Sequence, residues 1–382
     1  MRAAVVLTLA SGCIISEPAG KPQTWPPPLG VFVEAVTAGD LDGNGSTDVV
    51  VFASGDENQA GMYLLTGGKD LGNGSTRPVR SFTKFVPAAL QNPSTALQLG
   101  GSVPSVYVAT AEDKAGDDPG DKIELTRYSN ILAEQDRVTT SVPTGKALLW
   151  LHPIAFPGNM LHIAASDGSS IDHVAGDFGD VKPIPAPASA TWDLAQLTTS
   201  YASGMDQIAV VATPTSIQRA ALPGPSGGMF AWTTVRTGPA WVGQTSFDLD
   251  GDGREEIIGL DIASKQLCVV DPGAMAVPVT PVCLAISTLP PGNEVTLLVG
   301  TNITPNAGPD ILIVGASGVD TQFTLVEDYT YTPGTLIATS KPVPAGGPAH
   351  GRTVIVNNGP GTPNSVLSFG TDGIVACVMG PC

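Results

Sequence analysis

The feature of this sequence that most restricts its fold is a repeat of about 53 residues. Each copy has a short apolar segment, a loop rich in Gly, Asp and Asn, and a β-branched segment. The two clearest copies run from Ala35 to Gly55 and from Gly243 to Asp261. Fainter copies share the frame, and their second segments begin at or just after Ser105, Asn159, Asp206, Asp310 and Ser365. Repeats of about 40 to 50 residues with several strands each are typical of β-propeller blades.

The composition agrees with short strands rather than helices. The chain has 382 residues, with 45 Gly, 34 Pro and only 14% charged residues. Such a composition disfavours long helices and suits strands joined by many turns. With the repeat, it predicts an all-β fold, a seven-bladed β-propeller over residues 31–382. Six or eight blades remain open, because the fainter copies have few specific residues.

The charge balance excludes one class of partner. The net charge is −17, and no compensating cluster of Lys and Arg is present. Such a surface repels phosphate backbones, so nucleic-acid binding is not expected. After Ala10 there is no apolar run of about 18 residues that could span a bilayer as a helix. Any link to a membrane must therefore come from the N-terminus.

The N-terminal segment has the pattern of an export signal. Arg2 precedes an apolar run from Ala3 to Ala10, and small residues precede Cys13. This resembles a bacterial lipoprotein signal. It predicts a signal peptide at 1–12, lipid on Cys13, a Pro-rich extended spacer at 13–30 and a place on the outer membrane or cell surface. A secretory signal cleaved near Ala10, giving a secreted or periplasmic protein, and a start site upstream of Met1 are the alternatives.

The cysteines fit an exported protein. With Cys13 assigned to the lipid, an even number remains, which suits an oxidising compartment. These four are Cys268, Cys283, Cys377 and Cys382. Cys268 and Cys283 flank the turn signal Asp271-Pro-Gly and are expected to pair across a hairpin. Cys377 and Cys382 are close enough in sequence to join the tail to itself.

Two loops have the pattern of calcium sites. Both place oxygen-bearing side chains at positions one, three, five and nine, with Gly at position six. The first loop has Asp40, Asp42, Asn44 and Asp48 at these positions, with Ser46 at position seven. The second has Asp248, Asp250, Asp252 and Glu256, with Arg254 at position seven. Ca²⁺ prefers six to eight oxygen ligands, and the backbone carbonyls of Ser46 and Arg254 would add one each. The sequence therefore predicts two structural Ca²⁺ sites.

An EF-hand is excluded for both loops. That motif needs a Glu at position twelve and flanking helices, whereas position twelve is Val51 or Gly259 and strands follow. An acidic β-turn without metal is the alternative for either loop alone, since Asp-Gly and Asn-Gly form turns readily.

These segments resemble FG-GAP/VCBS repeats, the family that includes integrin α-subunit propellers and many bacterial surface proteins. The resemblance is carried by AGDLDGNGSTDVVV, FDLDGDGREEIIGLD and PDILIVGAS. It implies a seven-bladed propeller with Ca²⁺ held in loops on one face and recognition of protein or sugar on the opposite face or rim. The other five copies lack the acidic ligands and are expected to hold no metal.

Three functions fit these features. The first is a surface-anchored module that binds an extracellular protein or glycan, with the membrane contacted only through the lipid. The second is a propeller enzyme, a lyase or hydrolase, with its active site at the central channel. The third is a structural subunit of a surface assembly. No set of catalytic residues is recognisable, so none is assigned; carboxylates and a His clustered at the channel mouth would favour the enzyme.

Overall fold

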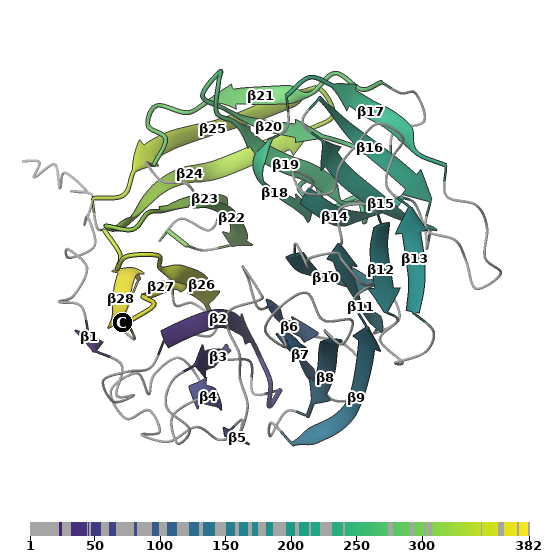
Figure 1. Ribbon diagram of the computed structural model, residues 1–382. Helices are drawn as coiled ribbons and strands as arrows, with labels where there is room; N and C mark the ends of the chain where they lie inside the picture. Colours follow the sequence, from purple (N-terminus) through teal and green to yellow (C-terminus); the bar gives the residue numbers. More distant parts are fainter. Residues whose placement is uncertain are drawn as a thin grey trace, which may run out of the picture.

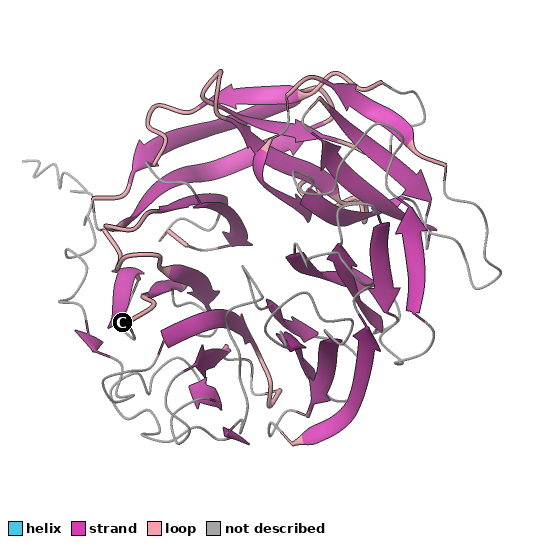
Figure 2. Cartoon of the chain, in the orientation of Figure 1, coloured by secondary structure: helices cyan, strands magenta, loops and turns pink. Residues whose placement is uncertain are grey.

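The structure is a computed structural model of the chain. It describes residues 23–24, 32–43, 45, 47–54, 61–65, 80–81, 94–98, 105–112, 122–129, 133–141, 150–156, 160–166, 170–174, 181–185, 196–202, 206–213, 215–221, 231–239, 241–273, 278–290, 294–301, 303–304, 308–344, 346–357, 363–372 and 374–380. In this part of the chain every element is a β-strand, and no helix is present that could span a membrane (Figure 2).

The described strands form seven four-stranded antiparallel sheets. In the first four sheets the strands follow chain order. These are β2 (Phe32–Gly39), β3 (Asp48–Ser54), β4 (Gly61–Leu65) and β5 (Arg80–Ser81); β6 (Ser94–Gln98), β7 (Ser105–Glu112), β8 (Lys122–Tyr128) and β9 (Glu134–Ser141); β10 (Trp150–Phe156), β11 (Met160–Ser166), β12 (Ser170–Val174) and β13 (Val181–Pro185); and β14 (Gln196–Ala202), β15 (Asp206–Thr213), β16 (Ser216–Ala221) and β17 (Thr233–Thr237).

The next two sheets repeat the pattern, and the last takes one strand from the other end of the chain. They are β18 (Val242–Phe247), β19 (Glu256–Asp261), β20 (Gln266–Val270) and β21 (Val282–Ala285); β22 (Glu294–Thr301), β23 (Pro309–Ala316), β24 (Thr321–Thr332) and β25 (Thr335–Pro342); and β26 (Arg352–Val356), β27 (Ser365–Phe369) and β28 (Ile374–Met379) with β1 (Gln23–Thr24).

The sheets are arranged around a common centre, with the first strand of each nearest that centre (Figure 1). The first strands of consecutive sheets contact one another, and β26 of the last sheet contacts β2 of the first. Antiparallel sheets joined in this order form an all-β fold of the β-propeller type. The all-β fold expected from the repeat is therefore confirmed.

The strand β1 completes the last sheet from within the segment assigned to the spacer. Gln23 and Thr24 pair with Val375 and Ile374 of β28. The spacer over 13–30 stays a prediction, and these two of its residues form a strand of the last sheet. Backbone groups form this pairing, so no apolar pattern in the sequence marks these two residues as a strand.

The core lies between neighbouring sheets rather than at the centre of the ring. One cluster joins Ile258 and Leu267 of one sheet to Ile311 and Val326 of the next. Two second strands show this burial on both faces: every residue of β27 is buried, as are all but the first of β23. The outer strand β25 is mostly exposed. Burial on both faces explains why β23 contains the continuous apolar run Ile311–Val314 instead of alternating with polar residues.

Close packing of the sheets explains a glycine in a buried strand. A Cβ atom placed on Gly259 of β19 would lie 2.6 Å from the Cβ of Trp241, a contact that side chains do not tolerate. Trp241 is itself buried between sheets.

The residues that mark the copies of the repeat in the sequence lie at or next to the start of the second strand of each sheet. Asp48, Ser105, Asp206, Glu256 and Ser365 are the first residues of β3, β7, β15, β19 and β27, and Asp310 is the second residue of β23. Asn159 lies outside the described residues, directly before β11. The interval found in the sequence is thus the interval between equivalent strands.

The expected hairpin disulfide is present. Cys268 of β20 and Cys283 of β21 are directly opposite in the ladder and are bonded to each other. Cys377 of β28 is also disulfide-bonded. Cys13 and Cys382 lie outside the described residues.

Candidate metal centres

The loop between β2 and β3 brings three carboxylates together. Asp40 and Asp42 lie in the loop, and Asp48 begins β3. One oxygen from each of these side chains lies within 4.8 Å of the other two. Asp48 is buried, Asp40 is half-buried and Asp42 is exposed. The loop therefore presents a group of acidic oxygens that is closed on the side of the sheet and open on the side of the solvent.

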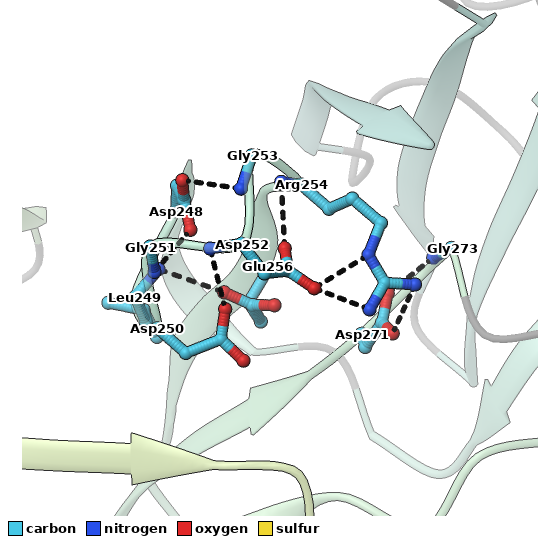
Figure 3. A network of polar contacts seen from close by, with 10 residues as sticks. All are labelled: Asp248, Leu249, Asp250, Gly251, Asp252, Gly253, Arg254, Glu256, Asp271 and Gly273. Atoms are coloured by element: carbon cyan, nitrogen blue, oxygen red, sulfur yellow. Dashed lines mark hydrogen bonds and ion pairs between the residues drawn. The ribbon is translucent and has the colours of Figure 1, made fainter. Parts of the chain in front are cut away.

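The loop between β18 and β19 repeats this arrangement. Asp248, Asp250 and the buried Glu256 bring one oxygen each within 4.8 Å of one another. Figure 3 shows these side chains, with Glu256 entering from the strand that follows the loop. The two carboxylate groups occupy equivalent places, since each lies between the first and second strands of its sheet.

Backbone hydrogen bonds to the residue at position one shape both loops. The amides of Gly43 and Gly45 donate to the two carboxylate oxygens of Asp40, at 2.7 and 2.8 Å. In the second loop Gly251 and Gly253 donate to Asp248 in the same way, at 2.8 and 3.0 Å. All four glycines have φ between 76° and 84°. Residues with a Cβ rarely adopt this conformation, so the glycines permit the sharp turn that gathers the side chains.

The residue at position nine closes each loop. The amide of Leu41 donates to Asp48 Oδ2 at 2.9 Å, and the amide of Leu249 donates to Glu256 Oε2 at 2.9 Å. Because an ionised carboxylate offers about four acceptor sites, this bond leaves capacity to bind a cation.

The electrostatic environment of Glu256 disfavours its charge. The pKa of Glu256 is raised from its usual 4.5 to about 7, mainly by burial and to a lesser extent by the charges of Asp250, Asp271 and Asp252. The hydrogen bond from Leu249 acts in the opposite direction, because it stabilises the ionised form. A cation bound among these carboxylates would stabilise the ionised form as well.

The side chain of Asp252 is engaged by a cation that the chain itself supplies. Arg254 donates from Nε and Nη2 to Asp252 Oδ2, at 2.8 and 2.5 Å, and from its backbone amide to Asp252 Oδ1 at 2.9 Å. Its Nη1 lies 3.8 Å from Asp271 Oδ2. Asp271 in turn accepts a 2.7 Å hydrogen bond from the amide of Gly273 (Figure 3).

Each loop also packs against the following sheet. Leu41 is 1% exposed and belongs to one apolar cluster with Val106 and Tyr128 of the β6–β9 sheet. Leu249 is 7% exposed and belongs to a cluster with Tyr329 of β24. The leucine at position two therefore connects the loop to its neighbour.

The loop between β22 and β23 has the closing carboxylate without the cluster. Asp310 is fully buried and accepts hydrogen bonds from the amide and hydroxyl of Thr304, at 3.1 and 3.3 Å, and from the amide of Asp328 at 3.1 Å. Burial raises the pKa of Asp310. Among the described residues only the β2–β3 and β18–β19 loops gather three or more potential metal-ligating side chains.

The donor chemistry of both loops fits calcium. The converging ligands are carboxylate oxygens, with no His or Cys among them, and hard cations such as Ca²⁺ prefer oxygen. Exposure of Asp42 leaves the first group accessible to an ion and to water.

The structure brings some of the predicted ligands together and not others. Positions one, three and nine converge in both loops. Asn44 and Ser46 lie outside the described residues. Asp252 is turned to Arg254 instead of joining the carboxylate group. The sequence predicted that Arg254 contributes its backbone carbonyl. It did not predict that the guanidinium pairs with Asp252. An Asp and an Arg two residues apart in a tight turn could have indicated this pairing.

A second polar cluster lies at the inner strands. Arg352, which begins β26, donates to Glu294 Oε2 at 3.1 Å, and Glu294 begins β22. Nδ1 of His350 lies 4.0 Å from Glu294 Oε1. His350 has a φ of 49°, and its amide donates to Ser317 O at 2.9 Å. These three side chains therefore share one rim of the ring.

Comparison with known proteins gives only distant structural matches. No protein-family model and no curated protein sequence matches the chain. An ulvan lyase, described as a new family of polysaccharide lyase, matches with a TM-score of 0.49 and 10% identity over 94% of this chain and 96% of its own. Prolyl oligopeptidase B from Galerina marginata matches with a TM-score of 0.46 and 11% identity over 92% of this chain and 51% of its own.

A cobalt-substituted apocarotenoid oxygenase from Synechocystis matches with a TM-score of 0.42 and 9% identity, over 86% of this chain and 92% of its own. The ulvan lyase and the oligopeptidase have β-propeller-type folds. Similarity at this level carries no information about activity.

Proposed function

We propose that this chain is a calcium-binding β-propeller that acts outside the cell as a module binding a protein or a glycan. The observation that carries this proposal is the convergence of three carboxylates in each of two loops that occupy equivalent places in their sheets. Like charges repel at the distance of 4.8 Å or less that separates these oxygens, so a bound cation would stabilise their arrangement.

Calcium in these loops would be structural. Asp40, Asp42 and Asp48 would hold one ion, and Asp248, Asp250 and Glu256 the other, with Asn44, Ser46, Asp252 and Arg254 completing the two loops. The ion would neutralise repelling charges on a chain whose net charge is −17. Since Leu41 and Leu249 pack on the following sheets, an ordered loop would also stabilise the contact between sheets.

The finer fold assignment is a seven-bladed propeller of FG-GAP/VCBS repeats. It is supported by the seven sheets of the described residues and by the repeat frame at the start of the second strands. The acidic loops both join a first strand to a second strand. In sheets of the same orientation such loops lie on one face, which leaves the opposite face and the rim for a partner.

Export and anchoring complete the proposal. The N-terminal pattern supports a lipid on Cys13, and the disulfide between Cys268 and Cys283 fits an oxidising compartment. Weak calcium binding, with a Kd of about 10⁻⁴ to 10⁻³ M, is common in extracellular modules and suits this location.

Isothermal titration calorimetry on the chelator-treated chain tests the metal sites. We expect uptake of two Ca²⁺ ions and a higher melting temperature with calcium than with chelator. Absence of uptake would make the loops ordinary turns. A glycan array and a pull-down from extracellular material, each with calcium and with chelator, then test recognition; a partner retained equally in both conditions would separate recognition from the metal.

Catalysis is a second candidate, and one observation favours it. Glu294, His350 and Arg352 meet at one rim of the inner strands, where a propeller enzyme would place its active site. Screening polysaccharide and ester substrates with the wild type and His350→Ala tests this. Turnover that disappears in His350→Ala would support an enzyme, and turnover that is absent or unchanged would contradict it.

A further inference from the structure

The two acidic loops differ in charge at positions five, seven and eight. The first has Asn44 and Ser46, which are neutral, whereas the second has Asp252 and Arg254. The charges of Asp252 and Arg254 cancel. Positions one, three, five, seven and nine therefore sum to three negative charges in each loop, and at position eight the second loop has Glu255 where the first has the neutral Thr47.

The structure shows how this cancellation is achieved. Both oxygens of Asp252 accept hydrogen bonds from Arg254, one from the backbone amide and the other from the guanidinium. The side chains are about one-third exposed. The guanidinium lowers the pKa of Asp252, and Asp252 raises the pKa of Arg254. The position-five carboxylate is thus paired with a cation that the chain itself supplies.

We propose that Arg254 is a built-in counter-cation of the second site, which competes with calcium for Asp252 and so sets the calcium affinity of this loop. This inference rests on the proposed calcium function. Like charges repel, so a guanidinium next to the site weakens the binding of a divalent ion. In the metal-free protein the same group offsets the repulsion among the acidic side chains.

Asp271 gives Arg254 a second partner. It lies at the end of β20, and its Oδ2 is 3.8 Å from Arg254 Nη1. When calcium recruits Asp252, the guanidinium therefore keeps an anionic neighbour. The turn that holds Asp271 follows Cys268, which is fixed to β21 by the disulfide. Arg254 thus exchanges a partner inside the loop for one outside it.

Arg254→Ser gives the second loop the residue that the first has at position seven. The wild type and this variant are compared in an Asp42→Ala background, which leaves the second site for calorimetry. Removing one positive charge beside a divalent ion should tighten calcium binding by about 3- to 10-fold. The melting temperature in chelator should fall, because the acidic groups lose their counter-cation.

Matched variants separate charge from shape. Arg254→Lys keeps the charge and should bind calcium within about twofold of the wild type. Asp252→Asn combined with Arg254→Ser gives positions five and seven of the second loop the residues of the first loop and should return the affinity toward the wild-type value. In the first loop, Ser46→Arg in an Asp250→Ala background should weaken binding, since Asn44 offers no charge to pair with the new guanidinium.

The possible outcomes separate the role of Arg254 from the existence of the calcium sites. Tighter binding in Arg254→Ser with near wild-type binding in Arg254→Lys supports the counter-cation. Calcium binding that is unchanged or weaker in Arg254→Ser overturns it and leaves the calcium sites in place. If neither wild-type loop takes up calcium, the proposed function and this inference both fail. Should Arg254→Ser not fold, the Ser46→Arg comparison still decides the question.

Discussion

The backbone amide of Leu41 donates a 2.9 Å hydrogen bond to the carboxylate of Asp48, the buried first residue of β3. Leu249 and Glu256 form the same bond, and Thr304 donates to Asp310 in a loop without the carboxylate cluster. The carboxylate at the end of the loop thus has a structural role that does not depend on metal. A copy of the repeat can therefore keep this carboxylate without the group of three, as the loop before Asp310 does.

Removal of one ligand should abolish one calcium site. We expect Asp42→Ala and Asp250→Ala each to lower the calorimetric stoichiometry from two ions to one. At calcium 100-fold above Kd, each site contributes about 2.7 kcal/mol. Melting temperatures should therefore fall clearly in calcium and less in chelator. Asp252→Asn, which copies the amide of Asn44, is the matched control and should retain both ions.

The leucine at position two should stabilise the sheet that follows its loop. Leu249→Ala should cost about 2 to 5 kcal/mol, the range for buried leucines, with hydrogen exchange accelerated in β24. Leu41→Ala should instead accelerate exchange in β8, which contains Tyr128. If both variants loosen the same strands, the contacts do not couple each loop to its own neighbour.

The stability of the calcium-free protein should fall as pH rises from 4.5 to about 7. The pKa of Glu256 is higher in the folded chain, about 7, than its usual 4.5. The folded state therefore binds more protons in this window, and raising the pH favours unfolding. Chemical denaturation at several pH values measures this slope. Glu256→Gln removes the titrating group, so a slope identical to that of the wild type would contradict the assignment.

Loss of the disulfide should destabilise the protein without removing a calcium site. The bond closes a loop with a sequence separation of 15, worth about 3 kcal/mol in the chain-entropy model. Cys268→Ser with Cys283→Ser should lower the free energy of unfolding by about this amount in chemical denaturation and leave calorimetric uptake at two ions. Reduction of the wild type provides the comparison.

Lipid on Cys13 should place the protein on a membrane surface. Globomycin treatment should leave an unprocessed precursor, and Cys13→Ala should release soluble protein. Ile14 follows the cysteine, in place of the Asp that commonly retains lipoproteins at the inner membrane, so outer-membrane fractions should contain the wild type. Unchanged fractionation in both treatments would exclude the anchor.

Much of the fold could be predicted because local and global patterns coincide. The β-branched runs after Asp48 and Glu256 form strands buried on both faces, and the loop glycines have the positive φ that the motif requires. The pairing of Cys268 with Cys283 followed from their places on either side of a turn.

The interactions that could not be predicted depend on neighbours distant in sequence or on side-chain direction. Leu249 meets Tyr329 only because consecutive sheets stack. Asp252 fits the ligand pattern, yet its oxygens accept hydrogen bonds from Arg254. The position of a residue in a motif does not determine which partner its side chain takes.

The pairing of β1 with β28 has a consequence for the order in which the molecule can form. The outer strand of the last sheet is synthesised near the beginning of the chain, and its three partners are synthesised at the end. No part of that sheet can reach its final state until translation is nearly complete. Contacts of such long sequence separation slow folding, so the other sheets have time to form first. A prematurely terminated chain would therefore leave β1 without β28 and β2 without β26.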